Sequence, residues 1–210
     1  MIAVIDYGAG NLRSVANALA ALGAPFFITS DPQGLERGSA ILLPGVGHFG
    51  QMMQALDSAR LTPALQRRLE AGTPYLGICL GLHALFEASE EAPGVRGLGL
   101  EPGAVRRFPS GLRVPHMGWS SVEPVAAGIL ARPAMYYFAH SYYVPEGVAG
   151  TAALARHGVP FTAVLARDNL AGSQFHPEKS GPAGLEFLRA WVESALVESP
   201  RSQIPGARSG

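Results

Sequence analysis

The first half of the chain alternates short apolar runs with segments of helical spacing, and this order most constrains the fold. The runs are rich in aliphatic and β-branched residues, as in strands buried on both faces. Strands are expected at 2–5, 25–29, 40–43 and 74–78, and helices at 11–22, 51–60, 63–71 and 80–90. Asn11 stands where it can cap the first helix, and Gly23 stands where that helix stops. Strands that alternate with helices predict right-handed βαβ crossovers and a parallel sheet.

The second half changes to short strands that are broken by Pro and Gly. They are expected at 104–108, 121–123, 134–138, 151–156, 162–167 and 171–174, followed by a helix over 184–197. The tail at 199–210 is rich in Pro, Ser, Gly and Arg and is expected to be mobile. The pattern predicts one α/β domain over residues 1–198. Its mostly parallel central sheet is flanked by helices and carries an antiparallel or mixed extension.

Composition excludes several classes of function. The 210 residues hold 16 Lys plus Arg and 16 Asp plus Glu, so the chain has no net charge with which to bind a nucleic acid. A single cysteine cannot form an internal disulfide, and no apolar run is long enough for a membrane span. The N-terminus has no basic region of a signal peptide. A soluble, cytoplasmic protein is expected.

The cysteine lies in the segment Gly-Ile-Cys-Leu-Gly at 77–81, where the fourth strand meets its helix. A nucleophile elbow needs this spacing, because small neighbours let the backbone turn sharply while the reactive side chain points outward. The thiol of Cys79 would lie at a helix N-terminus, whose partial positive charge favours the thiolate. A lone cysteine is more often a small buried hydrophobe, but the flanking glycines favour a nucleophile.

A histidine and a carboxylate follow the last predicted strand, in His176-Pro177-Glu178. A thiolate needs a base that takes and returns a proton, and the base needs a partner that orients it. His176 and Glu178 fit these two roles, although the triplet alone would equally suit a surface turn. Lys179, the only lysine of the chain, follows and indicates a site that uses a compact ammonium group.

The glycine-rich segment Pro-Gly-Val-Gly at 44–47 leaves the third strand. Its backbone N–H groups could stabilise an oxyanion together with the N–H of Leu80, which follows the nucleophile. Taken alone, the segment could also be a tight turn or a phosphate loop, although it lacks the Lys and Ser or Thr of a Walker A motif.

No metal or cofactor is expected. The other histidines have no metal-ligand spacing, and Arg13 stands where a dinucleotide fingerprint needs glycine. The segment 115–119 is interpreted as a loop with a buried Trp119; an exposed tryptophan there would mark an interface.

In this order, the motifs at 44–47, 77–81 and 176–178 resemble those of the class I (triad) glutamine amidotransferases. The resemblance runs from residue 1 to about 197 and is strengthened by Asp-Tyr-Gly-Ala-Gly-Asn at 6–11, Pro-His-Met-Gly-Trp at 115–119, His-Ser-Tyr at 140–142 and Phe-His-Pro-Glu-Lys-Ser at 175–180. These segments are similar to those of family members that serve histidine biosynthesis. There the resemblance implies a separate (β/α)8-barrel cyclase, which receives ammonia and forms imidazole glycerol phosphate and AICAR.

The resemblance also implies a role for each residue. Cys79 would attack the carboxamide of glutamine, His176 would protonate the leaving ammonia and then activate water, and Glu178 would hold the imidazole. The implied oxyanion and substrate contacts are Val46, Gly47, Leu80, His83, Glu91, His140, Ser141 and Tyr142. The implied contacts with the cyclase are Asn11, Met117, Trp119, Tyr137 and Lys179.

Three positions need comment. His83 replaces the glutamine that the family usually has four residues after the nucleophile, and it lies one helical turn from Cys79. Ser120 replaces an asparagine at the expected interface. Glu91 matches a family position that binds the amino group of glutamine, but its neighbour Glu90 could align there instead.

Two other functions stay open. A Cys-His hydrolase or peptidase of similar build would act alone, without stimulation by a partner. A binding module with a vestigial triad would keep every activity after the change Cys79→Ala.

Overall fold

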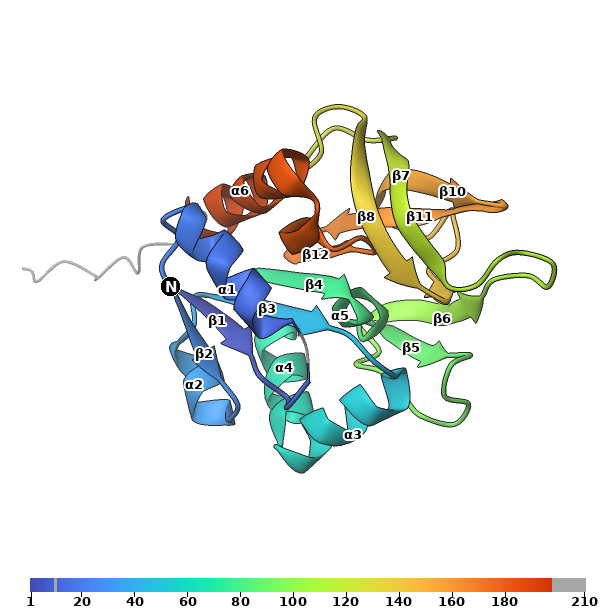
Figure 1. Ribbon diagram of the computed structural model, residues 1–210. Helices are drawn as coiled ribbons and strands as arrows, with labels where there is room; N and C mark the ends of the chain where they lie inside the picture. The colour runs from blue at the N-terminus through green and yellow to red at the C-terminus, as the bar shows by residue number, and fades with distance from the viewer. Residues whose placement is uncertain (10, 198–210) are drawn as a thin grey trace, which may run out of the picture.

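The computed structural model describes residues 1–9 and 11–197, and its centre is a nine-stranded sheet (Figure 1). The sheet is formed by β1 (Ile2–Ile5), β2 (Phe26–Thr29), β3 (Ala40–Gly45), β4 (Tyr75–Cys79), β7 (His116–Pro124), β8 (Ala134–His140), β10 (Thr151–His157), β11 (Val159–Arg167) and β12 (Leu170–Ser173). In space the order is β2-β1-β3-β4-β12-β11-β10-β7-β8. The first five strands are parallel and the last four extend them antiparallel, which confirms the predicted fold class.

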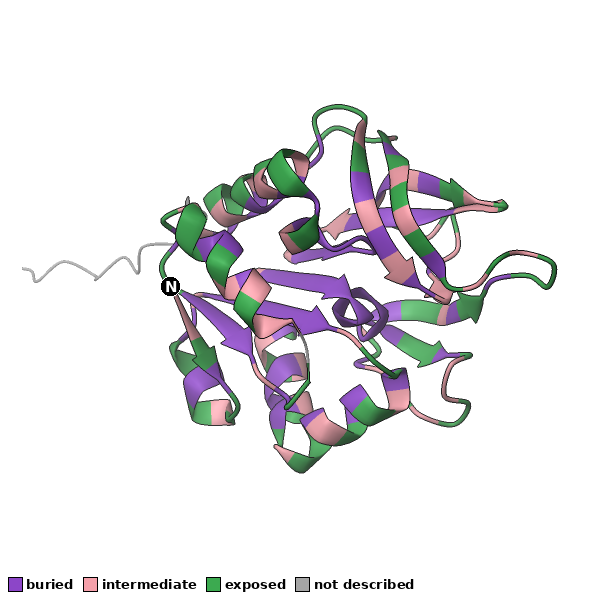
Figure 2. Ribbon diagram, viewed as in Figure 1, coloured by how far each residue is buried: buried purple, intermediate pink, exposed green. Residues whose placement is uncertain are grey.

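Helices cover both faces of the parallel strands (Figure 1). One face carries α1 (Leu12–Ala21) and α6 (Gly181–Val197), and the other carries α2 (Pro32–Arg37), α3 (Phe49–Ser58) and α4 (Leu61–Glu70). Alternation along β3 explains the two cores: Leu42 packs on the side of α1 and α6, whereas Ile41 and Leu43 pack on the side of α3 and α4. The central strands β1, β3 and β4 are therefore buried along their whole length (Figure 2).

Smaller elements lie beyond the carboxyl ends of the parallel strands. They are the helical turns α5 (Leu80–His83) and η1 (Pro177–Lys179) and a second sheet of β5 (Phe86–Ser89), β6 (Glu101–Arg107) and β9 (Tyr142–Tyr143). No helix within residues 1–9 and 11–197 has the length and apolar character needed to cross a membrane.

The predicted helix over 80–90 is wrong beyond its first turn. α5 ends at His83, and β5 begins at Phe86. The returning chain takes the carbonyls that a longer helix would use: the N–H of Leu98 donates to Ala84 O at 2.7 Å, and that of Gly97 donates to Glu87 O at 3.0 Å. Tertiary hydrogen bonds thus override the helical spacing of the segment.

Other differences are local. The structure adds α2, where Asp31 caps the helix by accepting from Gly34 N at 2.7 Å and Pro32 occupies its first turn. Asn11 precedes α1 but makes no side-chain capping bond, so the expected cap is wrong. The segment 115–119 is not a loop, because from His116 onward it pairs with β8. The predicted tail at 199–210 and the domain limit at 198 lie outside the described residues.

Candidate active site

Cys79 lies at a sharp turn between β4 and α5. Its backbone has φ +53° and ψ −102°, a conformation that is strained for a residue with a side chain. The flanking glycines make the turn possible: a Cβ on Gly77 would lie 2.3 Å from Gly81 O, and one on Gly81 would lie 2.0 Å from Leu43 O. The structure therefore has the strand-to-helix crease that the glycine spacing predicts.

His176 faces this crease from the segment after β12. Its Nδ1 lies 3.0 Å from Glu178 Oε1, and both side chains are almost fully buried. Burial alone would lower the pKa of His176, but attraction to the Cys79 sulfur and to Glu178 raises it to about 10. The raised pKa favours the protonated imidazolium of His176 in the site.

Backbone contacts hold His176 against β8. Its N–H donates to Tyr137 O at 2.9 Å, and its carbonyl accepts from Ser180 Oγ at 2.7 Å. Ser180 Oγ in turn accepts from Tyr137 N–H at 3.0 Å. Sequence reasoning gave Ser180 no role, although it ends the motif at 175–180.

A pocket of about 260 Å³ opens beside the Cys79 sulfur. It gathers residues from five separate parts of the chain, among them every predicted oxyanion and substrate contact. Its lining is Val46, Gly47, Cys79, Leu80, His83, Glu91, Ala139, His140, Ser141, Tyr142, His176 and Lys179. Of the predicted triad, Glu178 does not line the pocket, because it lies behind His176.

The glycine-rich segment at 44–47, the glycine loop, adopts a conformation in which the backbone N–H and carbonyl of Val46 are both hydrogen-bonded to Tyr7. Val46 N–H donates to the Tyr7 hydroxyl at 3.2 Å, and that hydroxyl donates to Val46 O at 3.3 Å. The expected use of Val46 N–H as an oxyanion donor is therefore not met in this conformation. Leu80 N–H is better placed, since it is the first amide of α5 and has no carbonyl one turn earlier in the helix.

The adjacent residues Glu90 and Glu91 have different surroundings. Glu91 lines the pocket and accepts from Phe49 N at 2.9 Å, whereas Glu90 pairs with Arg106 at 2.7 Å away from it. The structure thus places Glu91, and not Glu90, at the site. Within the described residues no group of three or more His, Cys, Asp or Glu side chains is arranged to hold a metal ion.

The residues expected to face a partner gather near one end of β7 and β8. Met117 is 64% exposed and Trp119 is 54% exposed, which rules out the buried tryptophan. Trp119 stands opposite Tyr137 with ring centroids 6.2 Å apart, and Lys179 Nζ lies 6.0 Å from the Tyr137 ring centroid. These aromatic residues and Lys179 form a continuous path from the surface to the pocket.

Asn11 and Ser120, also expected at the interface, are less exposed than Met117 and Trp119. Asn11 is half-buried at the start of α1, and α1 packs beside η1. Ser120 does not point outward with Trp119, because its hydroxyl lies 2.8 Å from Nε2 of the buried His116.

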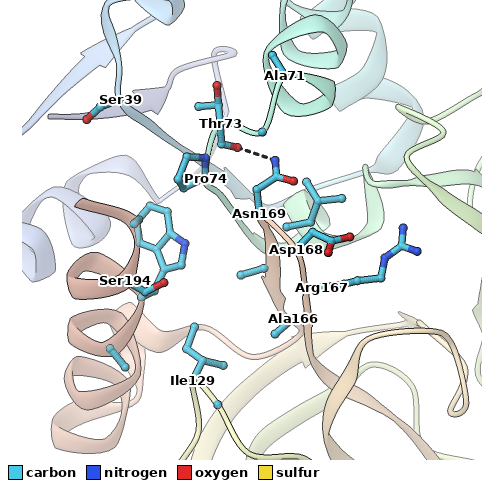
Figure 3. Close-up of a pocket in the computed structure, with 17 residues that line it drawn as sticks. Ser39, Ala71, Thr73, Pro74, Ile129, Ala166, Arg167, Asp168, Asn169 and Ser194 are labelled. Carbon is cyan, nitrogen blue, oxygen red and sulfur yellow. Dashed lines mark hydrogen bonds between the residues drawn. The ribbon is translucent and has the colours of Figure 1, made fainter. Parts of the chain in front are cut away.

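A larger hollow of about 760 Å³ lies at the amino ends of β3, β4 and β12, away from the carboxyl ends where Cys79 lies (Figure 3). The Asn169 amide in its lining is satisfied within the protein, because it donates to Leu69 O at 2.9 Å and to Thr73 O at 2.8 Å. It contains neither the cysteine nor the triad histidine, so the smaller pocket is the candidate active site.

Comparison with known proteins agrees with this geometry. The sequence model of the family described as "Glutamine amidotransferase class-I" matches residues 3–194. The chain is 51% identical over 185 residues to "Imidazole glycerol phosphate synthase subunit HisH" of Thermus thermophilus, covering 88% of this chain and 93% of that one. It is 50% identical over 196 residues to the HisH of Methanothermobacter thermautotrophicus, covering 92% and 98%.

This chain belongs to the class-I glutamine amidotransferases, in the HisH family. Solved structures show the same fold at lower identity. A crystal structure of a glutamine amidotransferase has a TM-score of 0.76 at 21% identity. The match covers 93% of this HisH-family chain and 99% of the chain in that crystal structure. The glutaminase domain of Trypanosoma brucei CTPS, solved with bound acivicin, has a TM-score of 0.64 at 18% identity, with 91% and 93% covered.

Proposed function

We propose that this HisH-family amidotransferase hydrolyses L-glutamine through a thioester on Cys79, in the pocket of about 260 Å³. The observation that carries the proposal is one pocket lined both by a cysteine at a strand-to-helix crease and by a histidine whose Nδ1 is held by a buried carboxylate. These are the parts of an activated nucleophile: the attacking atom, its base and the group that orients the base.

The first half-reaction forms a carbon–sulfur bond. The Cys79 thiolate attacks the carboxamide carbon of glutamine, and the negative charge that develops on the oxygen is stabilised by backbone N–H groups. The C–N bond breaks as His176 gives its proton to the nitrogen, and ammonia leaves a glutamyl thioester. The raised pKa of His176 means that the imidazolium is available to donate this proton at neutral pH.

The second half-reaction restores the enzyme. Neutral His176 takes a proton from water as the water attacks the thioester, and the C–S bond breaks to give glutamate and the thiolate. Glu178 keeps the imidazole in one orientation through both steps, because its Oε1 lies 3.0 Å from Nδ1.

The oxyanion site needs a second donor beside Leu80 N–H. Val46 N–H or Gly47 N–H supplies it once the glycine loop reorients, since Tyr7 holds Val46 in the present conformation. Gly47 already has φ +99°, so the loop can change its peptide orientation without side-chain strain.

We further propose that the ammonia passes to a (β/α)8-barrel cyclase, HisF, in a heterodimer. The exposed Met117 and Trp119 and the path from Trp119 to Lys179 support this surface as the interface. The cyclase would use the ammonia to form imidazole glycerol phosphate and AICAR. The single free cysteine fits a reducing compartment, so the cytoplasm is the proposed location.

One experiment tests the proposal as a whole. The chain is mixed with HisF, with and without the ribotide ligand of the cyclase, and glutamate release is followed for the parent chain, Cys79→Ala and the control Ser58→Ala, at an exposed position of α3. We expect turnover that is stimulated by HisF and its ligand, abolished by Cys79→Ala and unchanged by Ser58→Ala. Turnover that ignores HisF would favour a hydrolase acting alone, and full activity of Cys79→Ala would favour a binding module.

A further inference from the structure

Gln174 is a fully buried polar residue beneath the active site, and the mechanism above does not use it. It directly follows β12, and its backbone N–H donates to Ala163 O at 2.9 Å. Burying a carboxamide is costly unless its side-chain donors and acceptor find partners. The partners of this side chain therefore explain its place in the fold.

Both ends of the carboxamide contact residues of the active site. Gln174 Nε2 donates to Cys79 Sγ at 3.7 Å, within the range of a hydrogen bond to sulfur. Gln174 Oε1 lies 2.8 Å from His83 Nε2. A carboxamide oxygen can only accept, so the proton of the neutral imidazole lies on Nε2. Burial supports the neutral form, because it lowers the pKa of His83 to about 4 despite this bond.

This tautomer leaves His83 Nδ1 as a bare acceptor. Nδ1 is buried without a hydrogen-bond partner among the described residues, and His83 lines the pocket. An unpaired buried acceptor favours a ligand that brings a donor to it. Glutamine carries two such donors, its α-ammonium group and its carboxamide NH₂.

We propose that Gln174 is a positioning residue whose one carboxamide holds the Cys79 sulfur and fixes His83 in the tautomer that receives a donor of the substrate. The proposal rests on the glutaminase function proposed above. It couples the position of the nucleophile to substrate recognition, because both depend on the same side chain. Neither Cys79 nor His83 can shift without disturbing the bond that Gln174 makes to the other.

Two variants separate the two bonds. Gln174→Met keeps the length of the side chain and removes both bonds, whereas Gln174→Glu keeps an acceptor for His83 and places negative charge beside the sulfur. The matched control is Ser173→Ala: Ser173 is the preceding residue, equally buried, and its hydroxyl makes one hydrogen bond, to Phe175 O at 3.0 Å.

The first readout is the rate at which iodoacetamide alkylates Cys79 in the isolated full chain at pH 7. We expect Gln174→Met to slow alkylation about tenfold, since it loses a hydrogen bond to a charged sulfur, and Gln174→Glu to slow it further. Ser173→Ala should stay within about twofold of the parent chain, because its lost bond does not reach the sulfur.

The second readout is the ¹⁵N spectrum of the His83 imidazole, assigned by its loss in His83→Gln. The parent chain and Gln174→Glu should show protonated Nε2 and bare Nδ1, and Gln174→Met should show a mixture of tautomers. In the complex with HisF, Gln174→Met should raise KM for glutamine as well as lower kcat.

The outcomes are separable. If His83 of the parent chain is protonated on Nδ1, the inference is overturned. This measurement needs no substitution, so the inference stays testable even if a variant fails to fold. Parent-like alkylation and His83 spectra in a folded Gln174→Met also overturn it. If Cys79→Ala nevertheless abolishes turnover, only the role of Gln174 falls; if Cys79→Ala stays active, the proposed function falls.

Discussion

Trp119 offers the sharpest test of the proposed interface, because its exposure sets the size of the effect. A tryptophan side chain presents up to about 250 Å². Since Trp119 is 54% exposed, about 135 Å² is free to be buried by a partner. At about 25 cal/mol per Å² this area gives at most about 3 kcal/mol. Ordering costs and the area that alanine keeps reduce the expected loss in Trp119→Ala to about 2 kcal/mol, or a rise in Kd of about thirtyfold.

The assay is titration calorimetry of the chain against HisF. Val125 is a matched control, since it is also 54% exposed but follows β7 at the end away from Trp119. Val125→Ala should leave Kd within about twofold. An unchanged Kd for Trp119→Ala would remove the β7–β8 surface from the interface, and equal losses in both variants would show that exposure alone, and not position, decides the effect.

Three further predictions concern the active site. Glu178→Gln should lower kcat for glutamine hydrolysis about 100-fold or more, because the neutral amide removes the carboxylate charge that stabilises the His176 imidazolium and can turn its NH₂ donor towards Nδ1; steady-state kinetics with HisF would contradict this if kcat stayed within about tenfold. Tyr7→Phe should raise the glutaminase rate of the isolated chain about fivefold, since it frees Val46 N–H from a bond worth about 1 kcal/mol; a slower enzyme would refute that reasoning. Cys79→Ala should lower the pKa of His176 from about 10, because the attraction to the sulfur that raises this pKa is removed while burial continues to lower it. An NMR titration of His176 with no downward shift would contradict this prediction.

Much of the fold could be predicted because local patterns and tertiary structure agree in the first half. The parallel strands are buried on both faces, so their apolar runs are unambiguous. The segment after His83 shows where this fails: its helical spacing is real, yet the amides of Gly97 and Leu98 bind two of its carbonyls, and residues 86–89 pair with β6 as the strand β5. Contacts that distant in sequence leave no local trace.

The candidate site divides in the same way. Cys79 and His176 stand in motifs whose spacing has a mechanical reason, so both could be named from the sequence. Tyr7 stands inside the motif at 6–11 and Gln174 ends the strand expected at 171–174, but the sequence assigns a role to neither, because their significance lies in which atom each one meets. A pairing between Gln174 and His83 spans a separation of 91 residues, and only the folded chain brings them together.

Sheet order explains why these distant residues meet at Cys79. β4 pairs with β3 on one side and with β12 on the other, and the registers place Gly45 beside Cys79 and Ser173 beside Ile78. The glycine loop that follows β3 and the Gln174–His176 segment that follows β12 must therefore leave the sheet on either side of the sulfur. Because the three strands are parallel, their carboxyl ends share one edge, where ligands of open α/β sheets bind. A topology that separated β12 from β4 could keep every motif in the sequence and still have no triad.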